Sequence, residues 1–153
     1  MKEREIVAKS AQETQEAAGR FVREAPAEEG RGKARVVCLW GDLGSGKTTF
    51  VQGAAKALGI KGVVNSPTFL IMKKYPLAGK YEGGALYHFD CYRVRSAEEA
   101  ADLGWDEILS GADNLVFVEW PEKIMEILPE ERTDVEFENR GEDIRRIVFK
   151  ERG

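Results

Sequence analysis

At 153 residues the chain is long enough to bury one hydrophobic core, so we expect a single domain over residues 1–153. Its net charge of -4 disfavours direct electrostatic binding to nucleic acid or to an anionic membrane. No apolar run approaches the length of a membrane span, and the charged residues 1–5 do not resemble a signal peptide. With two cysteines that we expect to be reduced thiols, the sequence predicts a cytoplasmic protein.

The first elements along the chain are a short strand at residues 5–8 and a helix. Ser10 and, three residues later, Glu13 match a capping box that would begin this helix. The stripe that follows has the helical period and fades near Pro26: Thr14, Ala17, Ala18, Phe21 and Val22. Residues 34–40 then form an apolar, β-branched run that predicts a buried strand. A second helix is predicted to stop at Gly59, from the spacing of Phe50, Val51, Ala54 and Leu58.

Between this strand and this helix lies Gly41-Asp42-Leu43-Gly44-Ser45-Gly46-Lys47-Thr48, which has the G-x-x-x-x-G-K-[ST] pattern of a phosphate-binding loop. Glycines let the backbone fold around a phosphate, and the following helix presents its positive N-terminal end to the same anion. Lys47 can reach the outer phosphates, and the Thr48 hydroxyl can bind Mg²⁺. The flanking strand and helix favour a nucleotide site over an ordinary glycine-rich turn.

The rest of the chain predicts further strands and short helices. Residues 69–72 and 85–90 suggest a hairpin, residues 114–119 a buried strand, and the segments around Gly141 a final hairpin. A short helix is expected from Ser96 to near Gly104, and another from Pro121. This alternation predicts an α/β fold of the P-loop NTPase type, with a central mixed β-sheet flanked by helices on both faces.

Two predicted strands end in carboxylates, Asp90 and Glu119. P-loop enzymes use an acid at a strand end to hold Mg²⁺ or to orient the attacking water, which favours a function for both residues over simple loop capping. His88, the only histidine, lies in a strand, and we interpret it as structural rather than as a general base. The chain lacks the Asn-Lys-x-Asp and Asp-x-x-Gly motifs of GTPases.

Four segments together resemble the TsaE family, also called YjeE. They are Gly41–Thr49, Ser-Pro-Thr-Phe at 66–69, His-Phe-Asp-Cys-Tyr-Arg at 88–93 and Glu-Trp-Pro-Glu at 119–122. The resemblance runs from about Ser10 to Glu122, and it is looser in the C-terminal hairpin. It implies a small ATPase that uses ATP and Mg²⁺ and supports the TsaB–TsaD complex in forming threonylcarbamoyladenosine next to the anticodon of tRNAs. The negative charge suits contact with tRNA only through these partners and no contact with a membrane. No arginine is clearly placed as a finger on the γ-phosphate, so we expect slow hydrolysis without the partners.

The resemblance also implies site residues. It makes Thr48 and Glu119 the Mg²⁺ ligands, and Lys47 and Asp90 the catalytic residues. Asp90 would orient the attacking water or sense the γ-phosphate through a switch segment formed by Ser66, Pro67 and Thr68. The expected nucleotide contacts are Thr14, Asp42, Leu43, Gly44, Ser45, Gly46, Lys47, Thr48, Thr49, Asp90, Glu122 and, from the last hairpin, Arg145.

Two other functions remain open from the sequence. One is phosphoryl transfer to a small molecule, although no arginine-rich lid follows the nucleotide site to clamp a second phosphate. The other is a nucleotide-gated binding module with little turnover.

Overall fold

The computed structural model describes residues 2–24, 32–62 and 71–153. The proposed switch residues 66–68 lie outside these ranges, as do residues 69 and 70 of the expected hairpin. The described strands are β1 (Lys2–Ala8), β2 (Arg35–Trp40), β3 (Met72–Pro76), β4 (Ala85–Asp90), β5 (Leu115–Glu119), β6 (Arg132–Asn139) and β7 (Arg145–Arg152). The helices are α1 (Ala11–Arg23), α2 (Lys47–Ala57), α3 (Ala97–Ala101) and α4 (Trp105–Leu109), with 3₁₀ segments η1 (Gly79–Tyr81) and η2 (Pro121–Ile127).

The strands form one mixed sheet in the order β1-β7-β6-β2-β5-β4-β3. Strand β2 runs parallel to both β5 and β6, and β4 runs parallel to β5. The other neighbouring pairs, β1–β7, β6–β7 and β3–β4, are antiparallel. The carboxyl ends of β2, β4, β5 and β6 therefore meet at one edge of the sheet, where ligands bind in open α/β folds.

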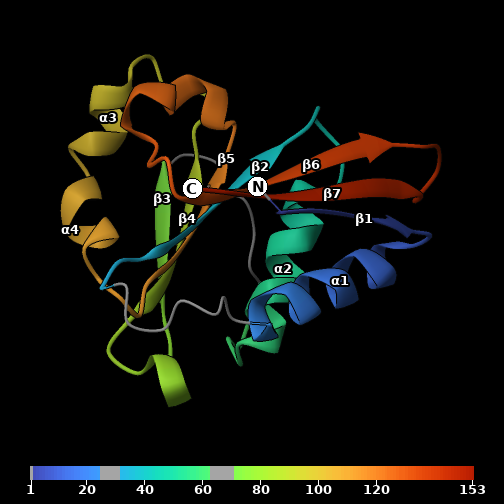
Figure 1. Ribbon diagram of the computed structural model, residues 1–153, viewed down its shortest axis with the longest axis horizontal. Helices are drawn as coiled ribbons and strands as arrows, with labels where there is room; N and C mark the ends of the chain where they lie inside the picture. Colours follow the sequence, from blue (N-terminus) through green and yellow to red (C-terminus); the bar gives the residue numbers. More distant parts are fainter. Residues whose placement is uncertain (1, 25–31, 63–70) are drawn as a thin grey trace.

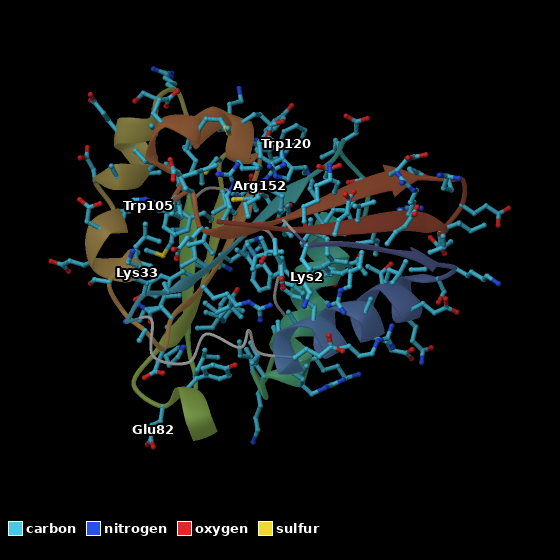
Figure 2. The ribbon with its side chains drawn as sticks, viewed as in Figure 1. Lys2, Lys33, Glu82, Trp105, Trp120 and Arg152 are labelled. Carbon is cyan, nitrogen blue, oxygen red and sulfur yellow. The ribbon has the colours of Figure 1, made fainter. Side chains whose placement is uncertain are left out.

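Helices cover both faces of this sheet, as the sequence predicts (Figure 1). Helices α1 and α2 pack on one face over a core that includes Phe21, Phe50 and Phe117. The other face is covered by α3, α4 and the segment η2. There the rings of Phe89 and Trp105 pack edge to face, with their centres 5.1 Å apart. Trp105, labelled in Figure 2, also donates from its Nε1 to the carbonyl oxygen of Ile127 at 3.0 Å. The α/β fold with helices on both faces is confirmed.

Helix α1 begins as its sequence predicts. Ser10 is the N-cap residue, and its hydroxyl accepts the backbone N–H of Glu13 at 3.1 Å. The Glu13 carboxylate accepts the N–H of Lys9 at 2.9 Å, one residue before the one that an ideal capping box would use. The helix then packs closely on α2, because a Cβ at Gly53 would lie only 2.4 Å from the backbone of Gln15.

Strand β3 is described over only part of the range predicted for it. We expected a strand at residues 69–72, of which 69 and 70 lie outside the described residues. The described strand runs from Met72 to Pro76 and so continues beyond the predicted end. It is an edge strand paired only with β4, and none of its residues is fully buried, so it can contain the consecutive residues Lys73 and Lys74. Pro76 is tolerated there because an edge strand has one side without ladder partners. Within the described residues, no helix is long and apolar enough to cross a bilayer.

Candidate functional site

The loop between β2 and α2 has a backbone shape that requires glycine at two positions. Gly41 has φ of 152°, and a Cβ there would lie 2.6 Å from the Ser45 Oγ. Gly46 has φ of 105° and is the N-cap of α2. Both values lie where residues with a side chain are strained. The loop thus keeps its backbone against the N-terminus of α2, which is the arrangement that binds phosphate.

Lys47 is held inside this loop. Its side chain is buried, and its Nζ donates to the carbonyl oxygen of Gly41 at 2.6 Å. The same Nζ lies 3.7 Å from the centre of the Trp120 ring, within range of a cation–π contact. Trp120 follows β5 directly and adopts a left-handed backbone with φ of 58°. A phosphate would therefore compete with these two contacts for the ammonium group.

The environment of Lys47 is acidic as well as buried. Burial lowers the pKa of Lys47 because it disfavours the charged form. Four carboxylates act in the opposite sense and raise the pKa: Glu119, Glu122, Asp90 and Asp42. The lysine is thus the cationic centre of an acidic site, which suits a Mg²⁺-bound polyphosphate better than a bare anion.

Glu119 and Thr48 meet where β5 and α2 converge. The Thr48 Oγ1 lies 3.5 Å from each oxygen of the Glu119 carboxylate. Only 4% of Glu119 is exposed, and its Oε2 lies 2.5 Å from the Nε2 of His88. A hydroxyl and a carboxylate are oxygen ligands of the kind that Mg²⁺ prefers.

Asp90 lies directly beside Glu119, in register on the neighbouring parallel strand. It is half-buried, and its Oδ1 accepts the backbone N–H of Tyr92 at 3.1 Å. Burial raises the pKa of Asp90, and the nearby Glu119 charge adds to this effect. The Tyr92 hydrogen bond, His88 and Lys47 lower that pKa, but burial remains the largest cause.

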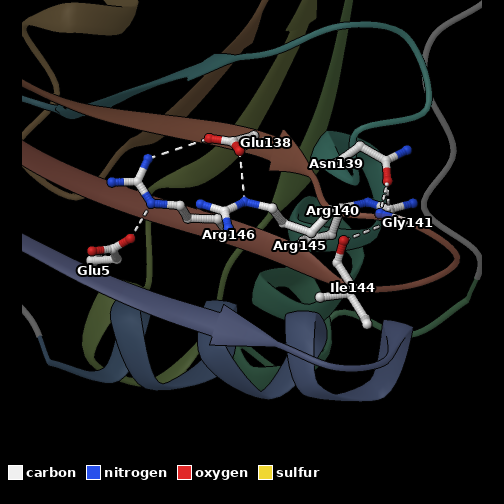
Figure 3. Close-up of polar contacts among 8 residues, drawn as sticks. All are labelled: Glu5, Glu138, Asn139, Arg140, Gly141, Ile144, Arg145 and Arg146. Carbon is white, nitrogen blue, oxygen red and sulfur yellow. Dashed lines mark hydrogen bonds and ion pairs between the residues drawn. The ribbon is translucent and has the colours of Figure 1, made fainter.

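Arg145 reaches the loop from the C-terminal hairpin, where β6 ends and β7 begins at the same edge of the sheet. Its Nη2 donates to the carbonyl oxygen of Gly44 at 3.2 Å, and its side chain lies beside Gly46. Its Nη1 donates to the Asn139 side chain at 3.2 Å (Figure 3). The same Nη1 also donates to the carbonyl oxygen of Glu142 at 2.7 Å. The hairpin therefore brings Arg145 to the loop, as its predicted nucleotide contact requires.

The other predicted nucleotide contacts lie at varied distances from this centre. Asp42 and Leu43 are exposed at the loop tip, and Thr49 lies in the first turn of α2. Glu122 is exposed on η2 and close enough to influence Lys47. Thr14 is buried in α1. The residue after it, Gln15, packs against Gly53 of α2, which lies about two helical turns from the loop.

These residues fit a nucleotide with Mg²⁺ in their chemistry. Among the described residues, no three or more His, Cys, Asp or Glu side chains are grouped so that they could hold a metal ion. A Mg²⁺ ion at Thr48 and Glu119 would therefore need phosphate oxygens and water to complete its coordination, as Mg²⁺ in nucleotide sites does. The Ser45 hydroxyl, buried with no hydrogen-bond partner, adds a polar group under the loop.

Two residues of the site were not anticipated from the sequence. His88 contacts Glu119, although only a structural role was assigned to it, and Trp120 covers Lys47. His88 and Asp90 are two residues apart on one strand and so point to the same face, which is the signal that could have linked them. The contact between Trp120 and Lys47 depends on a left-handed backbone that no local pattern indicates.

Comparisons with known proteins agree with this arrangement. A family model described as "Threonylcarbamoyl adenosine biosynthesis protein TsaE" matches residues 8–148. The chain is 46% identical over 116 residues to the tRNA threonylcarbamoyladenosine biosynthesis protein TsaE of Bacillus subtilis, covering 74% of this chain and 68% of that protein. It is 42% identical over 98 residues to the protein of the same name from Haemophilus influenzae, covering 64% of this chain and 59% of the relative.

A solved structure supports the same relationship over nearly the whole chain. The crystal structure of Bacillus subtilis YdiB matches with a TM-score of 0.76 and 34% sequence identity, covering 99% of this chain and 87% of that one. Sequence, fold and the loop between β2 and α2 therefore lead to one conclusion: the chain belongs to the TsaE family.

Proposed function

We propose that this protein is a Mg²⁺-dependent ATPase that supports the TsaB–TsaD complex in making threonylcarbamoyladenosine in tRNA. The observation that carries the proposal is the meeting of the Thr48 hydroxyl and the Glu119 carboxylate, 3.5 Å apart, beside the buried Lys47. Membership of the TsaE family supplies the pathway, and the names of its relatives refer to the same modification.

Within this proposal each residue at the centre has a defined task. The N-terminus of α2 and the Lys47 ammonium bind the outer phosphates of ATP. Thr48 and Glu119 would hold a Mg²⁺ ion, which would supply positive charge to the phosphate oxygens. Asp90 is only half-buried, so water can reach it, and burial raises its pKa; we assign it to orient the attacking water or to sense the γ-phosphate.

Hydrolysis by the isolated chain is proposed to be slow. The one arginine that we assign to the site, Arg145, donates to protein carbonyl oxygens at Gly44 and Glu142. Stabilising the charge on a transferring phosphoryl group needs an arginine or an equivalent cation directed at that group. Binding of TsaB–TsaD would supply or order such a group, which makes turnover depend on the partners.

An ATPase assay with and without TsaB–TsaD and tRNA tests the function as a whole. We expect turnover to rise when the complex is added, and the rise to require Mg²⁺. Equal turnover with and without the complex would favour the nucleotide-gated binding module instead. Phosphorylation of a small metabolite with no partner present would favour the phosphotransferase.

Calorimetry with ATP and Mg²⁺ tests the assigned site separately. Thr48→Ala removes a metal ligand and should abolish most of the Mg²⁺-dependent gain in ATP affinity. Thr48→Ser keeps the hydroxyl at the same place and serves as the matched control, which should bind as the native chain does. If Thr48→Ala kept the full Mg²⁺ response, the ion would not be bound where we propose.

A further inference from the structure

We propose that His88 is a positioning residue that fixes the Glu119 carboxylate in the orientation needed to hold Mg²⁺ against Thr48. This inference rests on the proposed function, because it concerns the metal ligand assigned there. It gives the buried histidine a role in the site that acts only through Glu119.

The geometry supports a specific link between the two side chains. His88 is fully buried in β4, and its Nε2 lies 2.5 Å from the Glu119 Oε2. The ring lies on the face of β4 that also carries Leu86 and Asp90, above the core under α1 and α2. The histidine thus stands between the apolar core and the carboxylate at the edge of the sheet.

The other ring nitrogen of His88 also indicates that the ring is retained for its hydrogen bond to Glu119. The Nδ1 of His88 is buried and has no hydrogen-bond partner. Leaving a buried polar atom unpaired is unfavourable, so a histidine kept only for packing would be replaced at little cost by an apolar residue. The one hydrogen bond that the ring makes in the described structure is the bond to Glu119.

The direction of this hydrogen bond follows from the chemistry of the partners. An ionised carboxylate only accepts hydrogen bonds, so the Nε2 of His88 carries the proton when Glu119 is charged. The bond holds Oε2 and so restricts the rotation of the whole side chain. Oε1, which lies 3.5 Å from the Thr48 hydroxyl, is the oxygen that we assign to the ion. Loss of a hydrogen-bond partner that orients a metal ligand in this way typically lowers metal affinity by about 10- to 100-fold.

Two isosteric substitutions separate this role from simple packing. In His88→Gln the side-chain amide nitrogen can reach the position of Nε2, whereas in His88→Asn it reaches only that of Nδ1. We expect His88→Asn to reduce the Mg²⁺-dependent gain in ATP affinity about 10-fold or more. His88→Gln should keep most of that gain, and both variants should bind ATP without Mg²⁺ as the native chain does.

A second variant without the hydrogen-bond donor keeps the test decisive if His88→Asn does not fold. His88→Met fills a similar volume with apolar atoms and suits the surrounding core, so it reports the loss of the hydrogen bond if the asparagine variant does not fold. Thermal unfolding of each variant identifies which ones are folded. A folded Asn or Met variant with the native Mg²⁺ response would overturn the inference.

A double-variant cycle tests whether His88 acts through Glu119. We expect His88→Asn to reduce the Mg²⁺ response in the native chain and to have no further effect in a Glu119→Gln background. Losses that multiply in the double variant would show an independent action and would overturn the inference. Failure of the proposed function looks different: there Thr48→Ala would also leave the Mg²⁺ response unchanged, whereas failure of the inference alone leaves the Thr48→Ala loss intact.

Discussion

The carboxyl ends of β4 and β5 lie side by side, yet they hold their carboxylates in different ways. Glu119 at the end of β5 is buried, bonded to His88 and next to the Thr48 hydroxyl. Asp90 at the end of β4 is half-buried and bonded to the backbone N–H of Tyr92. One carboxylate is fixed by two other side chains, whereas the other is fixed by its own loop.

This difference indicates why two adjacent acids can have separate tasks. A metal ligand must keep its oxygen in one place through the whole reaction, and the contacts of Glu119 provide this. A group that orients water needs access to solvent and a proton affinity shifted toward neutrality, and the raised pKa of Asp90 is in that direction. Substitutions in and around the site test whether Glu119 and Asp90 have these separate roles.

The largest effect is expected on turnover from Asp90→Asn. If Asp90 orients the attacking water, partner-stimulated ATP hydrolysis should fall by about 100-fold or more, because the interaction is made mainly in the transition state. ATP affinity in the presence of Mg²⁺ should change by less than about 2-fold. Asp102→Asn, an exposed acid that follows α3, is the matched control and should behave as the native chain. Loss of the Mg²⁺ response with turnover retained would reverse the two assignments.

The next effect is the loss of ATP affinity in Lys47→Ala. Removing a charge-assisted contact to phosphate costs about 2–3 kcal/mol, which weakens binding by about 30- to 150-fold. The substitution also removes a positive charge that lowers the pKa of Asp90. Lys56→Ala, in the exposed last turn of the same helix, controls for the loss of a lysine from α2. Calorimetry that found equal affinities for the two variants would place the phosphates elsewhere.

Glu119→Gln should act on the metal rather than on the nucleotide. We expect the Mg²⁺-dependent gain in ATP affinity to fall by at least about 10-fold, with little change in affinity when Mg²⁺ is chelated. A Mg²⁺ titration monitored by nucleotide binding measures both quantities. The control is Glu107→Gln, because Glu107 is exposed on α4, which covers the face of the sheet opposite α2. This variant should leave the titration unchanged. If Glu119→Gln gave the same Mg²⁺ titration curve as the native chain, Glu119 would not be the Mg²⁺ ligand that distinguishes it from Asp90.

The sequence predicted the parts of this site that depend on local pattern. The phosphate-binding loop, both carboxylates and the strands that carry them follow from motif and hydrophobic period, and the structure brings them to one edge. The place of Arg145 beside the loop is also consistent with its strand, because β7 begins at that edge. Binding itself remains a prediction for all of these residues.

What the sequence did not predict depends on pairings between distant segments. Strand β3 continues beyond its predicted end at residue 72, because an edge position in the sheet makes Lys73 and Lys74 acceptable within a strand. The link from His88 to Glu119 depends on the parallel register of β4 and β5, which a single chain's pattern does not fix. The contact of Lys47 with Trp120 depends on one left-handed residue.

The smallest effect concerns the stability of the chain rather than catalysis. Because the folded-state pKa of Asp90 is raised from its ordinary value of 3.8, the folded chain binds this proton more tightly than the unfolded chain does. The Asp90 contribution to stability is therefore greatest at pH below 3.8 and is lost as pH rises through the raised pKa.

Asp90→Asn removes this ionisation, and its amide oxygen can still accept the Tyr92 N–H. At pH 7 the ligand-free variant should thus be slightly more stable than the native chain, by only on the order of 0.5 kcal/mol because the Asp90 side chain is partly exposed to water. The gain should vanish below pH 3.8, where the native carboxyl group is protonated in both states. Urea unfolding at the two pH values measures it, with Asp102→Asn as the control. A variant that is less stable than the native chain at pH 7 would mean that the fold favours the charged form of Asp90 and would contradict this prediction.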